Sequence, residues 1–170
     1  MLECDQTSDP RRDLASDTTM TSDLGITPAT LAAEDVLAEL MREFYAHEGL
    51  DYERARAHEA FRTLVADPAL GRVWLFRVGD DVVGYTAVTI CYSLEFAGRY
   101  ALVDELYVRE GWRGRGIGAR ALELAAEACR ELGVAAVRLE VDTWNTRAMA
   151  LYRRLGFELQ ERYMMSRWIA

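Results

Sequence analysis

The run Arg113-Gly114-Arg115-Gly116-Ile117-Gly118 decides how the fold of this chain is interpreted. It follows an apolar, strand-like segment, residues 100–108, and opens a proline-free, helix-like segment, residues 118–132. Glycines let the backbone turn tightly, and the unpaired N–H groups at a helix N-terminus favour an anion. The run therefore predicts a cradle for a diphosphate group between a strand and a helix.

On both sides of this loop, the hydrophobic pattern predicts a series of helices and strands. Upstream we expect a short edge strand at residues 24–28, helices at 31–46 and 51–66, and strands at 72–78, 82–93 and 100–108. Downstream we expect a strand at 134–141, a helix at 145–155, and two short strands or a hairpin at 157–169. Thr30 is the expected N-cap of the first helix, and Gly49, Gly133 and Gly156 are expected to end helices. The predicted fold is α+β, with a mixed, mostly antiparallel sheet flanked by helices.

Length and composition indicate one globular domain. The chain has 170 residues, 51% of them hydrophobic, which is enough for a continuous core. Residues 1–23 are polar and lack the apolar region of a secretory signal, so we expect a disordered tail before a domain at residues 24–170. The longest apolar stretches are only strand-sized, so no membrane partner is expected and the predicted location is the cytoplasm.

Charge and cysteine spacing narrow the possible partners further. The formal net charge is −8, whereas a nucleic-acid-binding protein needs a basic surface, so no nucleic acid is expected. Cys4, Cys91 and Cys129 are too widely spaced for a zinc pattern, and no metal is predicted. Cys129 lies in an apolar helical segment, where we expect a buried, unreactive thiol.

Two other interpretations of the glycine loop remain open at this point. Residues 114–119 also satisfy the dinucleotide pattern G-x-G-x-x-A, with Glu140 as an acidic residue about 20 positions later. The loop lies behind antiparallel strands, however, which leaves too little chain for a doubly wound sheet. In the remaining interpretation, the glycines only shape a turn and the arginines are solvated.

A second motif follows the loop. Arg113-x-x-Gly116-x-Gly118 is followed by Asn145-x-x-Ala148-x-x-Leu151-Tyr152-x-x-x-Gly156-Phe157. In order and spacing, the two motifs together resemble the GNAT superfamily of N-acetyltransferases, and the similarity extends from about Ile26 to the C-terminus. The resemblance implies an acetyl-CoA-dependent N-acyltransferase whose sheet is splayed beside the strand that precedes the loop.

The resemblance also implies how acetyl-CoA, the co-substrate, would be held. The backbone of Leu106, Tyr107 and Val108 would bind the pantetheine arm, which Asn145 would also contact. The diphosphate would lie on the loop residues Arg113, Gly114, Arg115, Gly116, Ile117 and Gly118.

Acetyl transfer to an amine needs an uncharged nucleophile, a donor for the developing oxyanion and a proton for the departing thiolate. By resemblance, the Val108 N–H is the oxyanion donor and Tyr152 the general acid, although Tyr152 also fits a core aromatic on an amphipathic helix. The base is Asp104 or Glu105, which strand alternation places on opposite faces. Polyamine-type relatives carry such a pair in the reverse order. Glu140, which resembles the position used by ribosomal-protein N-terminal acetyltransferases, ranks third.

In this family the first two helices and their connection, here residues 44–52, choose the acceptor. Tyr45, Glu48 and Asp51 either line a pocket for a cationic amine or lie in a solvated loop. We expect a small primary amine, such as a polyamine, amino acid or aminoglycoside, and a homodimer, as in many relatives. Two other functions remain open: a NAD-type dinucleotide-binding oxidoreductase and a non-catalytic acyl-CoA-binding domain.

Overall fold

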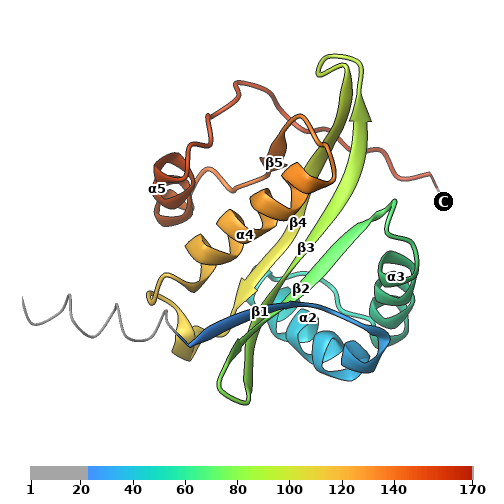
Figure 1. The fold of residues 1–170 in the computed structure, drawn as a ribbon, viewed down its shortest axis with the longest axis vertical. Helices are drawn as coiled ribbons and strands as arrows, with labels where there is room; N and C mark the ends of the chain where they lie inside the picture. The colour runs from blue at the N-terminus through green and yellow to red at the C-terminus, as the bar shows by residue number, and fades with distance from the viewer. Residues whose placement is uncertain (1–22, 170) are drawn as a thin grey trace, which may run out of the picture. The chain divides into compact units, whose positions relative to one another are not determined.

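The computed structural model describes residues 23–169 (Figure 1). These residues divide into two compact units, one ending at Glu140 and the other beginning at Val141. The predicted disordered tail, residues 1–23, lies outside the described residues except for Asp23.

The first unit contains the sheet and most of the helices. In chain order its elements are β1 (Leu24–Pro28), the 3₁₀ turn η1 (Leu31–Ala33), α2 (Glu34–Glu48), α3 (Arg54–Ala66), β2 (Gly71–Val78), β3 (Asp81–Ser93), β4 (Gly98–Val108), the 3₁₀ turn η2 (Glu110–Trp112), α4 (Ile117–Glu131) and β5 (Val137–Leu139).

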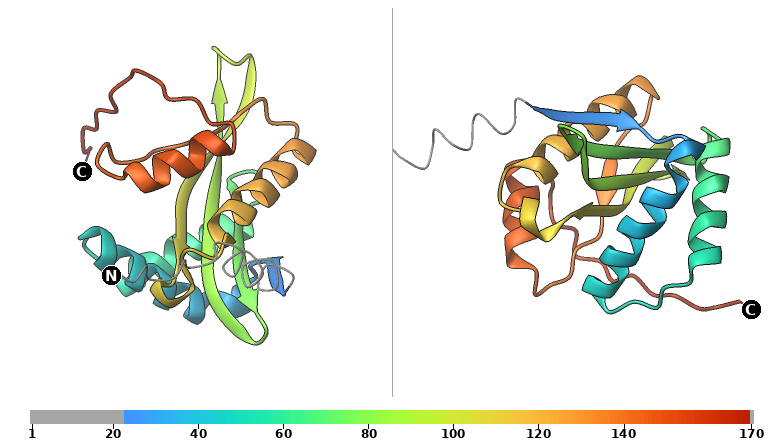
Figure 2. Two further views of the ribbon diagram at one scale, coloured as in Figure 1. Left: turned by 90° about the vertical axis from the view of Figure 1, so that its left-hand side faces the viewer. Right: turned by 90° about the horizontal axis from the view of Figure 1, so that it is seen from below.

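The sheet is mixed and mostly antiparallel, as predicted. Its strands lie in the order β1-β2-β3-β4-β5; the first three pairings are antiparallel and β4 pairs with β5 in parallel. Helices α2 and α3 cover one face of this sheet, and α4 covers the other (Figure 2). Residues 23–169 contain no doubly wound parallel sheet, which the dinucleotide interpretation requires.

The core beneath α2 and α3 comes from alternate residues of three neighbouring strands. It contains Val73, Leu75, Tyr85, Ala87 and Tyr107 of the sheet and Leu37, Leu40, Met41, Ala57 and Phe61 of the helices. A tyrosine pair therefore lies inside this core, where each hydroxyl needs a polar partner.

The parallel pairing of β4 with β5 is short. It joins Ala101–Val103 to Val137–Leu139, and from Asp104 to Val108 no described strand pairs with β4 on that side. The strand predicted at residues 134–141 is therefore reduced to three residues. This early separation confirms the splayed sheet that the resemblance implied.

A β-bulge lies in β4 at Asp104. On β3, Ala87 faces Glu105 but the next residue, Val88, faces Val103, so Asp104 is the extra residue. A bulge interrupts the alternation of side chains along a strand. Glu105 therefore lies on the same face as Tyr107, opposite Ala87 and beneath α2. The regular alternation on which the separation of Asp104 from Glu105 was expected is therefore interrupted between these two residues.

The three glycines predicted to end helices do so, but the predicted N-cap does not cap a helix. Gly49, Gly133 and Gly156 have φ values of 70°, 68° and 85°, the left-handed conformation that ends helices. Thr30, the expected N-cap, makes no side-chain capping bond. It precedes the 3₁₀ turn η1 rather than α2, and only its backbone oxygen accepts a bond, from the Ala33 N–H.

The second unit contains one helix, α5 (Thr146–Arg154), among its described residues. The Asn145 side chain caps it, because its Oδ1 accepts a hydrogen bond from the Ala148 N–H at 3.1 Å. The Tyr152 ring lies edge-on to Phe157, with 5.9 Å between centroids. Residues 157–169 form no strand, so the hairpin predicted there is wrong. A strand needs a partner to complete its ladder, and no described strand pairs with this segment.

Candidate active site

The glycine loop forms a ring of free backbone donors at the start of α4. Gly114 and Gly116 have φ values of 79° and 77°, and Gly116 is the N-cap of the helix. Within residues 23–169, the N–H groups of residues 114–118 donate to no carbonyl; the first bond of this turn runs from Arg120 N to Gly116 O at 3.0 Å. Such a set of N–H groups suits a diphosphate.

The arginine side chains of the loop contact their own protein surroundings. Arg113 Nε donates to the Val108 carbonyl at 2.8 Å, and its Nη1 lies 3.2 Å from His47 Nε2. Arg115 donates to the Gly111 carbonyl at 2.9 Å and lies over the Trp112 ring, 4.7 Å from its centroid. These arginines therefore shape the loop and add positive charge beside the free N–H groups.

A carboxylate held by tyrosine hydroxyls lies under α2. Tyr85 donates to Glu105 Oε2 at 2.6 Å, and Tyr45 of α2 also hydrogen-bonds this carboxylate. Burial raises the pKa of Glu105, the two tyrosine hydrogen bonds lower it in part, and the charge of Asp104 raises it again. The net pKa shift is upward. Glu105 can therefore accept a proton more readily than an exposed glutamate.

Asp104 belongs to the same electrostatic cluster. Its side chain is exposed, yet the surrounding protein removes enough hydration to raise the pKa of its carboxyl. Its charge contributes to the upward pKa shifts of Glu105, Tyr45 and Tyr85. The structure thus brings both predicted acids together, with Glu105 the more buried of the two.

The end of α2 and the connection that follows it contain packed aromatic side chains and exposed acidic ones. Tyr45 packs edge-on against Tyr52 at 6.0 Å between centroids, and the Tyr52 hydroxyl donates to the Ala38 carbonyl at 2.8 Å. Glu48 and Asp51, in contrast, are exposed. Of the three residues considered for a cation pocket, only Tyr45 contacts the acidic cluster; Glu48 is the exposed last residue of α2, and Asp51 lies in the solvated connection that follows.

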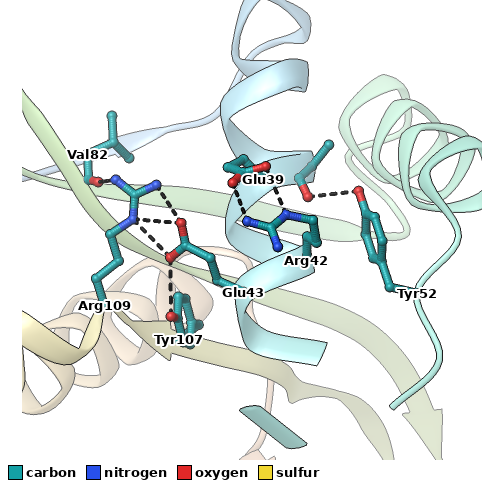
Figure 3. A network of polar contacts seen from close by, with 8 residues as sticks. Glu39, Arg42, Glu43, Tyr52, Val82, Tyr107 and Arg109 are labelled. Atoms are coloured by element: carbon teal, nitrogen blue, oxygen red, sulfur yellow. Dashed lines mark hydrogen bonds and ion pairs between the residues drawn. The ribbon is translucent and has the colours of Figure 1, made fainter. Parts of the chain in front are cut away.

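Sequence reasoning missed two polar side chains of this region. Tyr85 lies in a buried strand whose composition gives no sign of a role in a site. Glu43 lies on α2. It binds Tyr107, which is in β4, and Arg109, which is the residue after β4 (Figure 3). One signal was available for Glu43: it is an acid next to Phe44 and Tyr45 on a helix predicted to be amphipathic.

Asn145 and Tyr152 belong to the second unit, as does the rest of the downstream motif from Asn145 to Phe157. Asn145 caps α5, and Tyr152 is half-buried on the same helix. Their predicted roles at the cofactor and at the departing sulfur remain predictions.

No helix within residues 23–169 is long and apolar enough to cross a membrane. The same residues hold no group of three or more His, Cys, Asp or Glu side chains that could bind a metal ion. Cys129 is fully buried, as expected, and burial raises the pKa of its thiol.

Comparison with known proteins shows which family has this sequence and this mixed sheet. The sequence profile of the family described as "Acetyltransferase (GNAT) family" matches residues 33–157. The chain belongs to the GNAT family. Like other members it is an acetyltransferase, and its acetyl donor is acetyl-CoA.

Two mammalian enzymes are similar in sequence to this GNAT protein. It is 40% identical over 78 residues to thialysine N-epsilon-acetyltransferase of Bos taurus, covering 46% of this chain and less than half, 45%, of that protein. The Sus scrofa enzyme of that name is 31% identical over 133 residues, 71% of this chain and 75% of that protein.

Among solved structures, an integron cassette protein from the Cole Harbour salt marsh metagenome has a TM-score of 0.79 and 34% identity, over 89% of this chain and 93% of that one. A Clostridium acetobutylicum acetyltransferase solved with acetyl-CoA has a TM-score of 0.72 over 85% of this chain and 96% of that one. At 14% identity, the second likeness concerns the fold alone.

Proposed function

We propose that this GNAT enzyme transfers the acetyl group of acetyl-CoA to the primary amine of a small molecule by direct attack, with Glu105 as the base and Tyr152 as the general acid. The observation that carries the proposal is the Glu105 carboxylate, partly buried, hydrogen-bonded by Tyr85 and Tyr45 and raised in pKa. A general base works best when its pKa approaches the working pH. Asp104 acts on it at a distance, by raising that pKa.

The backbone at the end of β4 supports the proposed oxyanion donor. Arg109 N donates to the Val83 carbonyl of β3 at 2.9 Å. Because successive N–H groups of a strand point in opposite directions, the Val108 N–H points away from β3, toward the side where β5 has separated. A donor in that position is free to stabilise charge that develops on a carbonyl oxygen.

The free N–H groups of residues 114–118 fit the diphosphate of acetyl-CoA, and the backbone groups of Leu106 and Val108 on the unpaired side of β4 fit its pantetheine arm, whereas those of Tyr107 between them face β3. When bound, acetyl-CoA supplies a thioester carbonyl that is open to attack. Glu105 would take a proton from the acceptor ammonium and leave a neutral amine. Tyr152 would give its proton to the departing sulfur, while Asn145 would contact the cofactor arm.

The acceptor that fits this arrangement is a cationic small molecule. Asp104 and Glu105 place negative charge at the proposed attack site, which attracts an ammonium group. The mammalian relatives are named for the N-epsilon amine of thialysine. We therefore place amino acids with a side-chain amine first among the acceptors, ahead of polyamines and aminoglycosides.

Titration calorimetry and a thiol-release assay test this function. Coenzyme A should bind, NAD⁺ should not, and acetyl-CoA with an amine panel should release free thiol. Binding of NAD⁺ in place of coenzyme A, or binding of coenzyme A without turnover for any amine, would contradict the proposal. The second result would favour a non-catalytic acyl-CoA-binding domain. The expected homodimer and cytoplasmic location are separate predictions, which sedimentation and cell fractionation can check.

A further inference from the structure

Two side chains of α2 contact the two arginines that flank the exit from β4. Glu43 and His47 are four residues apart and therefore share one face of the helix. The Glu43 carboxylate accepts from Arg109 Nε at 3.0 Å and from Nη2 at 2.8 Å (Figure 3). His47 Nε2 accepts from Arg113 Nη1 at 3.2 Å, since a guanidinium can only donate.

Arg109 is held from two further directions. Its Nη1 donates to the Val82 carbonyl at 2.9 Å, and its backbone N–H donates to the Val83 carbonyl at the same distance. A guanidinium with partners on both α2 and β3 has little freedom left. The residue that follows β4 is therefore fixed to the sheet and to α2 together.

Tyr107 extends this contact into the site. Its hydroxyl donates to Glu43 Oε2 at 3.2 Å, and its ring lies beneath the Arg113 guanidinium, 5.6 Å from the centroid. Arg113 in turn donates to the Val108 carbonyl. Glu43 is therefore linked through one tyrosine and two arginines to the residues on either side of η2, where the chain passes from β4 into the glycine loop.

The burial of this contact separates it from an ordinary surface ion pair. The side chains of Arg109 and Glu43 are 34% and 24% exposed, and removing one partner of a partly buried pair leaves the other uncompensated. One turn earlier on the same helix, Glu39 hydrogen-bonds Arg42, and those side chains are 44% and 53% exposed; its charge acts on Arg109 without a hydrogen bond between them among the described contacts. Surface pairs of that kind contribute little.

We propose that Glu43 is a positioning residue for acetyl-CoA: through Arg109 and Tyr107 it sets the position of Val108 and of the free N–H groups at residues 114–118. This inference depends on the proposed function, because it assumes that the diphosphate lies on those N–H groups. In this role Glu43 would contact neither substrate directly. Its effect should therefore appear in the constants for acetyl-CoA and not in those for the amine.

The substitution Glu43→Gln keeps the size of the side chain but removes its charge and one acceptor oxygen. The segment from Val108 to Gly118 would then spend less time in the conformation that binds acetyl-CoA. The apparent affinity for acetyl-CoA falls in proportion to the fraction of molecules in that conformation. We expect Kd and KM for acetyl-CoA to rise about tenfold, which corresponds to about 1.4 kcal/mol. KM for the amine should stay within about twofold of its wild-type value.

The experiment compares the full-length wild type, Glu43→Gln and the matched control Glu39→Gln. Calorimetry gives Kd for coenzyme A, initial rates give KM for both substrates, and thermal denaturation reports stability separately. The control should bind coenzyme A like the wild type. A Glu43→Gln protein with a lowered Tm but unchanged Kd and KM would overturn the inference, because a purely structural contact would behave that way. Equal losses in both variants would also overturn it.

Two further comparisons keep the result interpretable. Arg109→Gln should weaken coenzyme A binding to a similar degree, and the double variant should be no weaker than either single one, because the two residues act as a unit. If Glu43→Gln does not fold, Glu43→Asp retains the charge but shortens the reach; a folded Glu43→Asp with unchanged Kd overturns the inference. Failure of the wild type to bind coenzyme A would refute the proposed function itself.

Discussion

The hydroxyl of Tyr85 donates a hydrogen bond to the carboxylate of Glu105, with 2.6 Å between the two oxygens. A hydrogen bond to a carboxylate favours its charged form, whereas burial disfavours it. Burial is the larger effect here, so the pKa of Glu105 is raised overall. The tyrosine limits this rise and holds the carboxylate in one orientation.

Replacing Glu105 with glutamine should remove the base and leave the cofactor site unchanged. We expect kcat to fall about 10²- to 10⁴-fold, the usual contribution of a general base. Coenzyme A affinity, measured by calorimetry, should stay near the wild-type value because the carboxylate faces α2 and not the glycine loop. Asp104→Asn is the control and should cost far less. A larger loss of kcat in Asp104→Asn than in Glu105→Gln would reverse the assignment of the base.

The pH dependence of kcat should report the ionisation of Glu105. Only the carboxylate can take a proton, so kcat should fall as the pH drops through the raised pKa, at a pH above the ordinary value of 4.5. Tyr85→Phe removes a hydrogen bond that lowers this pKa, so the acidic limb should move to higher pH. Asp104→Asn removes a charge that raises it, so the limb should move to lower pH. If the acidic limb moves in the same direction in the two variants, this account is contradicted.

Tyr152→Phe tests the proposed general acid. The variant retains the ring that packs against Phe157, and thermal denaturation reports any change in stability separately. Coenzyme A binding should persist while turnover falls, because the phenol proton is lost. Acceptors should be compared at saturating acetyl-CoA to isolate the chemical step. Unchanged kcat would assign Tyr152 to the packing of α5 alone.

Gly84→Ala should destabilise the sheet beside the site. A Cβ at this position would lie 2.2 Å from the Tyr107 carbonyl oxygen and 2.9 Å from Phe76 Cδ2, so β3 and β4 would have to separate. We expect a loss of about 1–3 kcal/mol, as for other overpacked sites, measured by denaturant unfolding. Gly118→Ala is the matched control: no atom lies within 4 Å of its added Cβ, and it lies in the first turn of α4. That variant should unfold at an equal or higher denaturant concentration.

The fold was predictable where glycines and hydrophobic periodicity agree. The order of strands and helices from β1 to α5, the left-handed glycines at helix ends and the parallel pairing of β4 with β5 all follow from local pattern, whereas the strands predicted at residues 157–169 do not form. The bulge at Asp104 did not follow, because it depends on how β4 fits against β3 and leaves no mark in the order Val103-Asp104-Glu105. Thr30 illustrates a similar limit. Threonine is a residue type that often caps helices, but here a 3₁₀ turn separates Thr30 from α2.

The candidate site was predictable in its acids and its loop but not in their partners. Asp104, Glu105 and the run from Arg113 to Gly118 stand out as charged or glycine-rich residues between apolar segments. Tyr85, Tyr45 and Glu43 acquire their contacts only when strands and helices far apart in sequence pack together. Such contacts depend on tertiary structure, which periodicity alone does not specify.

The early separation of β4 from β5 leaves unpaired backbone in the interior of the sheet rather than only at its rim. Unpaired strand backbone can bind a strand of another molecule and so promote self-association. If acetyl-CoA lies along residues 106–108, it covers this backbone whenever it is bound. Protein kept with coenzyme A should therefore remain dispersed longer than protein kept without it, and light scattering over time would measure that protection.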